Sequence, residues 1–287
     1  MSAVRTPEDP DAAFQRPSRL ARAERRATRR RFLAGGLGTI AAGAAVALGN
    51  ASPASASTLP ASPYSLPLYL SRRDWGCDES LAKEPDGNRI WPVEFAPVQK
   101  ITVHHTASYT PYGADEAAEL VRSVYYEHTV DQEFGDIGYH LLIDPDGRVY
   151  EGRYSGGTSF PIYDVHPSQA AGAPRAVVAG HTYQYNLGNI GIAMLGDMDG
   201  DGCTDAAWWS LELVIAMIAV NTGVTADGRS TYSNPATQKS VDLPNVCGHQ
   251  HYAQTDCPGS TMMGWMKDLR AGSKKLQVEM PAGVWLA

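Results

Sequence analysis

Two short segments, far apart in the chain, carry side chains of the kind that share a metal ion. One is the strand-like run at 100–103 (Lys-Ile-Thr-Val), which ends in His104-His105-Thr106. The other is the segment 246–259, Val-Cys-Gly-His-Gln-His-Tyr-Ala-Gln-Thr-Asp-Cys-Pro-Gly. Two imidazoles and one thiolate leave the fourth position of a tetrahedral Zn²⁺ open to water, which distinguishes a hydrolytic zinc from a closed structural one. A fold that uses both segments must bring this strand end to the C-terminal segment.

The first 56 residues have the features of an export signal. Arginines at 29–31 precede an apolar, Gly/Ala-rich stretch at 32–48, and Ala54-Ser55-Ala56 fits a small-residue cleavage site. We therefore expect residues 1–56 to be a twin-arginine (Tat) signal peptide and the protein to be secreted, extracellular or attached to the cell wall. A basic arm that binds nucleic acid is the alternative. The apolar stretch is a poor permanent anchor, so we expect no stable membrane insertion after cleavage.

Charge and length limit the class of protein. Residues 57–287 contain 15 basic and 27 acidic residues, a formal net charge of −12. A body this acidic lacks the positive surface that nucleic acid requires, so we expect no nucleic-acid partner and recognition through local pockets. The Pro/Ser-rich segment 57–70 is predicted to be an irregular leader. The remainder, 71–287, has the size of one domain, which we expect to be a monomer.

Apolar periodicity predicts strands and helices in alternation. Strands are predicted at 98–104, 139–144, 148–151 and 189–196, the middle two forming a hairpin across Asp146-Gly147. Helices are predicted at 114–128, 206–221 and 260–276. The second helix is strongly apolar but too short to span a bilayer. Segments 154–188 and 223–243 lack periodicity and are predicted to be long loops. The pattern indicates an α/β fold.

Short motifs follow one another in a recognisable order. They are Trp75-Gly76, His104-His105-Thr106, Ile137-Gly138-Tyr139-His140, Tyr150-Glu151-Gly152-Arg153, His181 with Tyr185-Asn186, Ile190-Gly191-Ile192, and Gly248-His249 with Cys257-Pro258-Gly259. The series resembles the N-acetylmuramoyl-L-alanine amidase (amidase type 2) and peptidoglycan recognition protein family, from about Arg73 to Leu276. Together with the export signal, it suggests a secreted bacterial member. The resemblance implies a central mixed β-sheet flanked by helices on both faces, with a zinc-bearing groove.

The resemblance implies a zinc ion bound by His104, His249 and Cys257. His104 ends a strand, where a ligand can project into a cleft. His105 faces the other way, because successive residues of a strand alternate between faces. His251 is either a group behind the ligands or an exposed side chain.

The other cysteines and an acidic loop leave further possibilities open. Outside the cytoplasm, Cys77, Cys203 and Cys247 allow at most one disulfide, either Cys203–Cys247 or Cys77 with one of these. An EF-hand-like spacing makes Ca²⁺ a second candidate cofactor, at Asp197, Asp199, Asp201 and Asp205. Position 12 of that loop is Trp208 instead of Glu, so an Asp-rich turn capping the next helix is the alternative.

Catalytic and substrate-binding residues are also implied by the resemblance. Tyr139 matches the catalytic tyrosine, whose phenol can donate to an oxyanion without competing for zinc. A packed strand aromatic is the alternative. Thr255 falls where catalytic members carry a lysine or threonine, or it caps a turn. The implied groove contacts, for which packing is the alternative, are Arg153, His181, Tyr185 and Asn186.

The function implied is a zinc-dependent hydrolase whose partner is peptidoglycan. It would cleave the amide between N-acetylmuramic acid and L-alanine of the stem peptide. One alternative is a non-catalytic peptidoglycan-binding module, although such relatives commonly replace the cysteine that this chain keeps at Cys257. Another is a structural zinc domain in which His251 or Cys247 supplies a fourth ligand.

Overall fold

The computed structural model describes residues 67–156 and 161–284. The described residues belong to one compact unit. The predicted signal peptide and most of the predicted leader lie outside the described residues.

A six-stranded mixed sheet forms the centre of the described unit, in the order β1-β5-β4-β7-β3-β10. Its strands are β1 (Tyr69–Leu70), β5 (Val149–Glu151), β4 (Leu141–Ile143), β7 (Asn189–Met194), β3 (Lys100–His105) and β10 (Val246–Gly248). Strands β4, β7, β3 and β10 are parallel, and β5 runs antiparallel to β4. The edge strand β1 pairs with β5 and includes the end of the predicted leader, which is therefore not irregular throughout.

The predicted strands and the hairpin are confirmed. Every residue of β3 and β7 is buried, as expected for central parallel strands covered on both faces. The hairpin forms between β4 and β5, with Leu142 opposite Tyr150.

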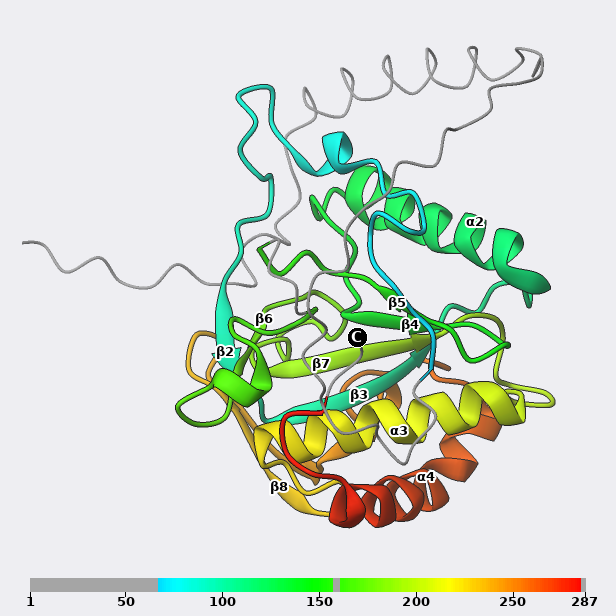
Figure 1. Ribbon diagram of the computed structural model, residues 1–287, viewed down its shortest axis with the longest axis vertical. Helices are drawn as coiled ribbons and strands as arrows, with labels where there is room; N and C mark the ends of the chain where they lie inside the picture. The colour runs from blue at the N-terminus through cyan, green and yellow to red at the C-terminus, as the bar shows by residue number, and fades with distance from the viewer. Residues whose placement is uncertain (1–66, 157–160, 285–287) are drawn as a thin grey trace, which may run out of the picture. The chain divides into compact units, whose positions relative to one another are not determined.

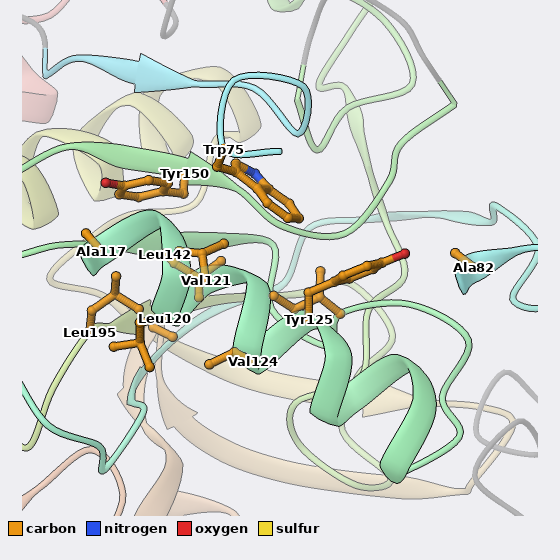
Figure 2. Packing of buried hydrophobic residues seen from close by; sticks show 12 residues of the cluster. Trp75, Ala82, Ala117, Leu120, Val121, Val124, Tyr125, Leu142, Tyr150 and Leu195 are labelled. Carbon is orange, nitrogen blue, oxygen red and sulfur yellow. The ribbon is translucent and has the colours of Figure 1, made fainter. Parts of the chain in front are cut away.

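Three long helices cover the sheet on its two faces (Figure 1). On one face lies α2 (Gly113–Tyr126), which continues into a π-helical turn, η3 (Glu127–Asp131). Val121 and Tyr125 of this helix pack with Trp75 and Leu142 (Figure 2). The other face carries α3 (Asp205–Thr222) and, beyond it, α4 (Ser260–Glu279).

The position of α3 explains its sequence. It packs against α4 (Figure 1), which itself also contacts β10, and residues on all sides of α3 are buried. A helix enclosed in this way is apolar all round and needs no polar face. Within the described part of the chain, no helix combines the length and apolarity needed to cross a bilayer.

Both segments predicted to be long loops contain strands, so these predictions are wrong. Segment 223–243 holds most of the hairpin β8 (Arg229–Asn234) and β9 (Lys239–Pro244). Segment 154–188 holds η4 (Pro167–Gln169) and β6 (Arg175–Val177), which pairs with β2 (Phe95–Pro97). The β8–β9 hairpin is rich in exposed polar residues, so it shows no apolar alternation in the sequence.

All four cysteines are free, so none of the three candidate disulfides forms in this structure. Cys247 is buried in β10, and its thiol donates to the carbonyl of Pro244 at 2.8 Å. Cys77 and Cys203 are partly buried. The fourth cysteine, Cys257, belongs to the site described next.

Candidate metal centre

Two neighbouring strands bring the first two predicted ligands together. Strand β10 is parallel to β3, with Gly248 in register with Val103. The residues that follow, His104 and His249, therefore lie side by side, with ring centroids 4.7 Å apart. The 3-10 turn η5 (His249–His251) begins at the second of them.

Cys257 completes the group. Its sulfur lies 3.4 Å from Nδ1 of His104. In the described part of the chain, His104, His249 and Cys257 form the one group of three or more His, Cys, Asp or Glu side chains that could share an ion, with ligand atoms within 4.8 Å of one another. Two imidazole nitrogens and one sulfur are a donor set that suits zinc.

The chain that leads to Cys257 is fixed by its own hydrogen bonds. The backbone N–H of Gln250 donates to the carbonyl of Cys257 at 3.1 Å, and its side-chain amide donates to the carbonyl of Asp256 at 3.0 Å. Thr255 Oγ1 accepts the N–H of Cys257 at 3.2 Å. Thr255 thus caps the turn before the ligand, which was one of its two expected roles, and its hydroxyl proton is not used in that bond.

The two histidines next to the predicted ligands point elsewhere. His105 lies on the opposite face of β3, where its Nδ1 accepts the N–H of Met198 at 3.1 Å. His251 turns back on the chain, and its Nδ1 accepts the N–H of Gly248 at 3.2 Å. Neither His251 nor Cys247 joins the ligand group, so a structural zinc site closed by one of them does not form.

The acidic loop gives no support to the calcium prediction. The predicted ligands Asp197, Asp199, Asp201 and Asp205 are not among the described groups that could share an ion. Oδ1 of Asp199 instead accepts the N–H of Ser260 at 2.6 Å, in the first turn of α4. A carboxylate there satisfies a free helix N–H and favours the positive end of the helix dipole. The spacing also lacks the bidentate Glu at position 12, where Trp208 stands.

Of the predicted groove contacts, three are buried. Arg153 has no exposed surface; its guanidinium pairs with Asp136 at 2.8 Å and donates to the carbonyl of Pro92 at 2.7 Å. Oδ1 of Asn186 accepts the backbone N–H of His181 at 3.0 Å. The contacts of Arg153 and Asn186 are packing contacts, which was the alternative interpretation of these residues. His181 lies directly behind a predicted metal ligand, with its Nδ1 3.0 Å from Nε2 of His104.

Tyr185, the fourth, is partly exposed. Its ring packs against those of Tyr232 and Tyr252, at centroid distances of 5.6 and 5.1 Å. Tyr232 belongs to the unexpected β8–β9 hairpin, which therefore packs against Tyr185.

Tyr139 lies beside the metal centre, with its ring centroid 5.1 Å from that of His104. Burial raises the pKa of its phenol, and the neighbouring Cys257 thiol acts in the same direction. The hydroxyl therefore keeps its proton at neutral pH and can donate a hydrogen bond.

His128 was not predicted to belong to the site. Its ring lies 5.2 Å from that of Tyr139, and its Nδ1 accepts the N–H of Gly138 at 3.0 Å. Burial lowers the pKa of His128 to about 4, so the ring is neutral at physiological pH. In the sequence it is only the last residue of a helical pattern; the π-helical turn that carries it gives no sequence signal, although such turns are frequent at functional sites.

Burial also sets the protonation states of the three ligands. It lowers the pKa of His104 and of His249, and it raises the pKa of the Cys257 thiol to about 11. Neutral imidazoles are the form that binds a metal. A bound cation would deprotonate the thiol outright.

The fold and the site define an α/β protein with a mixed six-stranded sheet and a His/His/Cys centre at the ends of two parallel strands. The family model described as N-acetylmuramoyl-L-alanine amidase matches residues 94–260. The chain therefore belongs to this family.

Curated relatives include recognition proteins and an amidase. Peptidoglycan-recognition protein SA of Drosophila melanogaster is 28% identical over 146 residues, which cover 51% of this chain and 58% of that protein. N-acetylmuramoyl-L-alanine amidase of Homo sapiens is 27% identical over 173 residues, covering 60% of this chain and 24% of that protein. The chain thus spans less than two thirds of each. Both relatives are animal proteins and lend no support to the bacterial origin expected above.

The X-ray structure of bumblebee PGRP-SA has a similar fold. Its TM-score is 0.50 at 22% identity, and the match covers 70% of this chain and 95% of that chain. This likeness concerns the fold alone.

Proposed function

We propose that this protein is a zinc-dependent N-acetylmuramoyl-L-alanine amidase. It hydrolyses the amide bond that joins N-acetylmuramic acid to L-alanine of the peptidoglycan stem peptide. The observation that carries the proposal is the convergence of His104, His249 and Cys257 in a member of the amidase family.

The residues present fit a zinc ion. Three donors of suitable type lie within 4.8 Å of one another, and the described part of the chain adds no fourth protein ligand to the group. When bound, zinc supplies Lewis acidity, which polarises an amide carbonyl and acidifies water.

Tyr139 and Thr255 contribute from the protein side. The protonated phenol of Tyr139 donates a hydrogen bond to the amide oxygen as that oxygen gains negative charge, and a donor of this kind is worth roughly 10²–10³ in rate. The Thr255 hydroxyl, in the turn before Cys257, is a second donor that can stabilise the same negative charge. Both groups are neutral donors, so neither competes with the ligands for a cation.

A second function, binding of peptidoglycan without hydrolysis, has one observation in its favour. A similar protein in Drosophila melanogaster is named a recognition protein. The intact sulfur ligand at Cys257 favours hydrolysis, because it leaves the metal site complete.

We also propose that the mature protein acts outside the cytoplasm as a monomer. The paired arginines, apolar stretch and Ala54-Ser55-Ala56 support export by the Tat route. Peptidoglycan is the partner that the family membership supports.

The test uses purified cell walls. We expect loss of turbidity and release of peptides with a free L-alanine amine by the wild type, and neither by Cys257→Ser nor after treatment with a chelator. Full activity of Cys257→Ser would refute the assigned site. Binding to walls without release of such peptides would favour the recognition function.

A further inference from the structure

A chain of hydrogen bonds runs from the metal centre into the interior. Nε2 of His104 lies 3.0 Å from Nδ1 of His181, and Nε2 of His181 lies 2.9 Å from the carbonyl oxygen of Asn189. A carbonyl oxygen only accepts hydrogen bonds, so Nε2 of His181 carries the proton of that ring. In a neutral imidazole the other nitrogen then has the lone pair, and Nδ1 of His181 is an acceptor.

The proton position of one ring determines that of the next. Because Nδ1 of His181 accepts, the shared hydrogen belongs to Nε2 of His104. His104 is thereby held as the tautomer whose Nδ1 has a free lone pair. This is the nitrogen that lies 3.4 Å from the sulfur of Cys257, on the side of the metal centre. Both rings are buried, and burial disfavours the charged imidazolium form.

The structure fixes His181 in this place from two directions. The Asn186 side chain accepts the backbone N–H groups of His181 and Thr182, at 3.0 and 2.8 Å. Below the ring, a Cβ added at Gly191 would lie 2.6 Å from its Cγ and Cδ2 atoms. Gly191 therefore provides the space that the ring occupies, which explains a glycine in the middle of a fully buried strand.

We propose that His181 is a positioning residue of the metal centre: it selects the tautomer of His104 whose Nδ1 binds the metal, and it holds that ring in the binding orientation. This inference rests on the proposed zinc site. It gives His181 a role in metal affinity in place of the substrate contact expected from the sequence. Partners of this kind typically account for about 10–100-fold in metal affinity.

Two measurements on the purified full chain test the proposal. The first is long-range ¹H–¹⁵N NMR of the histidine rings of the metal-free wild type, where we expect His104 and His181 both to carry the proton on Nε2. The second is zinc affinity, measured by competition with a chromophoric chelator. His181→Phe keeps the ring volume but removes the acceptor, and we expect it to lose about 10–100-fold in affinity. His181→Asn keeps an acceptor oxygen near the position of Nδ1, and we expect it to stay within a few-fold of the wild type.

His140→Phe is the matched control. His140 is a buried histidine whose ring packs 5.6 Å from that of His181, but its hydrogen bonds go to Val177 and Gly191 and not to a ligand. We expect this variant to lose stability while keeping zinc affinity, and thermal unfolding of each metal-free variant reports whether it is folded.

Two results would overturn the proposal: a wild-type His104 protonated on Nδ1, or a folded His181→Phe variant that binds zinc as tightly as the wild type. If the wild type itself binds no zinc, the proposed function fails instead. The two failures are therefore distinguishable.

Discussion

The sulfur of Cys257 lies 3.4 Å from Nδ1 of His104, although 153 positions separate the two residues in the chain. We expect Cys257→Ser to weaken zinc binding by more than roughly 100-fold, because a neutral hydroxyl replaces a thiolate ligand. Mutation of a residue that only hydrogen-bonds to a ligand already lowers metal affinity by about 10–100-fold. Metal content after dialysis and chelator competition measure the change. The control is Cys203→Ser, a partly buried cysteine outside the ligand group, which should bind like the wild type. A Cys257→Ser protein that retains stoichiometric zinc at wild-type affinity contradicts the assignment.

Removing one hydroxyl tests the role of Tyr139. We expect Tyr139→Phe to lower kcat on wall fragments by about 10²–10³-fold, since one donor to a developing oxyanion is lost. Zinc content and binding to walls should not change, because the phenol is not a ligand. Tyr112→Phe removes a phenol from a highly exposed side chain and should leave kcat unchanged. Unaltered kcat in Tyr139→Phe would show that the hydroxyl takes no part in the reaction.

Acid should destabilise the fold through its buried histidines. His140 has no exposed surface, its Nδ1 accepts the N–H of Gly191 at 2.9 Å, and burial lowers its pKa from 6.5 to about 4. Between these two values the unfolded chain takes up a proton that the folded protein does not, so stability present above pH 6.5 is lost as the pH falls toward 4. For this one group the loss between pH 7 and pH 5 is roughly 2 kcal/mol. Urea unfolding at both pH values should show a smaller pH effect in His140→Gln than in the wild type, and equal effects would contradict this account.

The fold was predictable from the sequence where a helix or strand is buried along its whole length. Strand β7 is buried on both faces and is apolar after its first residue, and α3 is buried on all sides and has an apolar sequence. The β8–β9 hairpin could not be found in this way, since its residues are mostly polar and exposed. Its contacts with the core include the buried charge of Lys100 and hydrogen bonds between Gln99 and Ser233, and periodicity carries no information about such contacts.

The ligand set was predictable for a different reason. Histidine and cysteine are recognisable in the sequence as side chains that bind metals. The alternation of side chains along a strand was enough to place His104 and His105 on opposite faces. The role of His181 depends on a loop that folds back over β7 and on the space above Gly191, neither of which is local in sequence. The acidic loop is the opposite case: its spacing matched a calcium site, yet Asp199 is used by α4.

Lys100 links the β8–β9 hairpin to the core, so its replacement should loosen that hairpin. The fully buried ammonium donates to the carbonyls of Ser230 and Leu243 at 2.6 and 2.9 Å and to Oδ1 of Asn245 at 3.0 Å. Lys100→Met has a similar length but leaves these acceptors without their donor, and we expect the free energy of unfolding to fall by about 2–4 kcal/mol. Lys267→Met, on the exposed side of α4, should change it by less than about 0.5 kcal/mol. Hydrogen exchange should become faster in β8 and β9 of Lys100→Met before it does in β3. If the variant is as stable as the wild type and its hairpin amides stay protected, the ammonium is not what attaches the hairpin to the core.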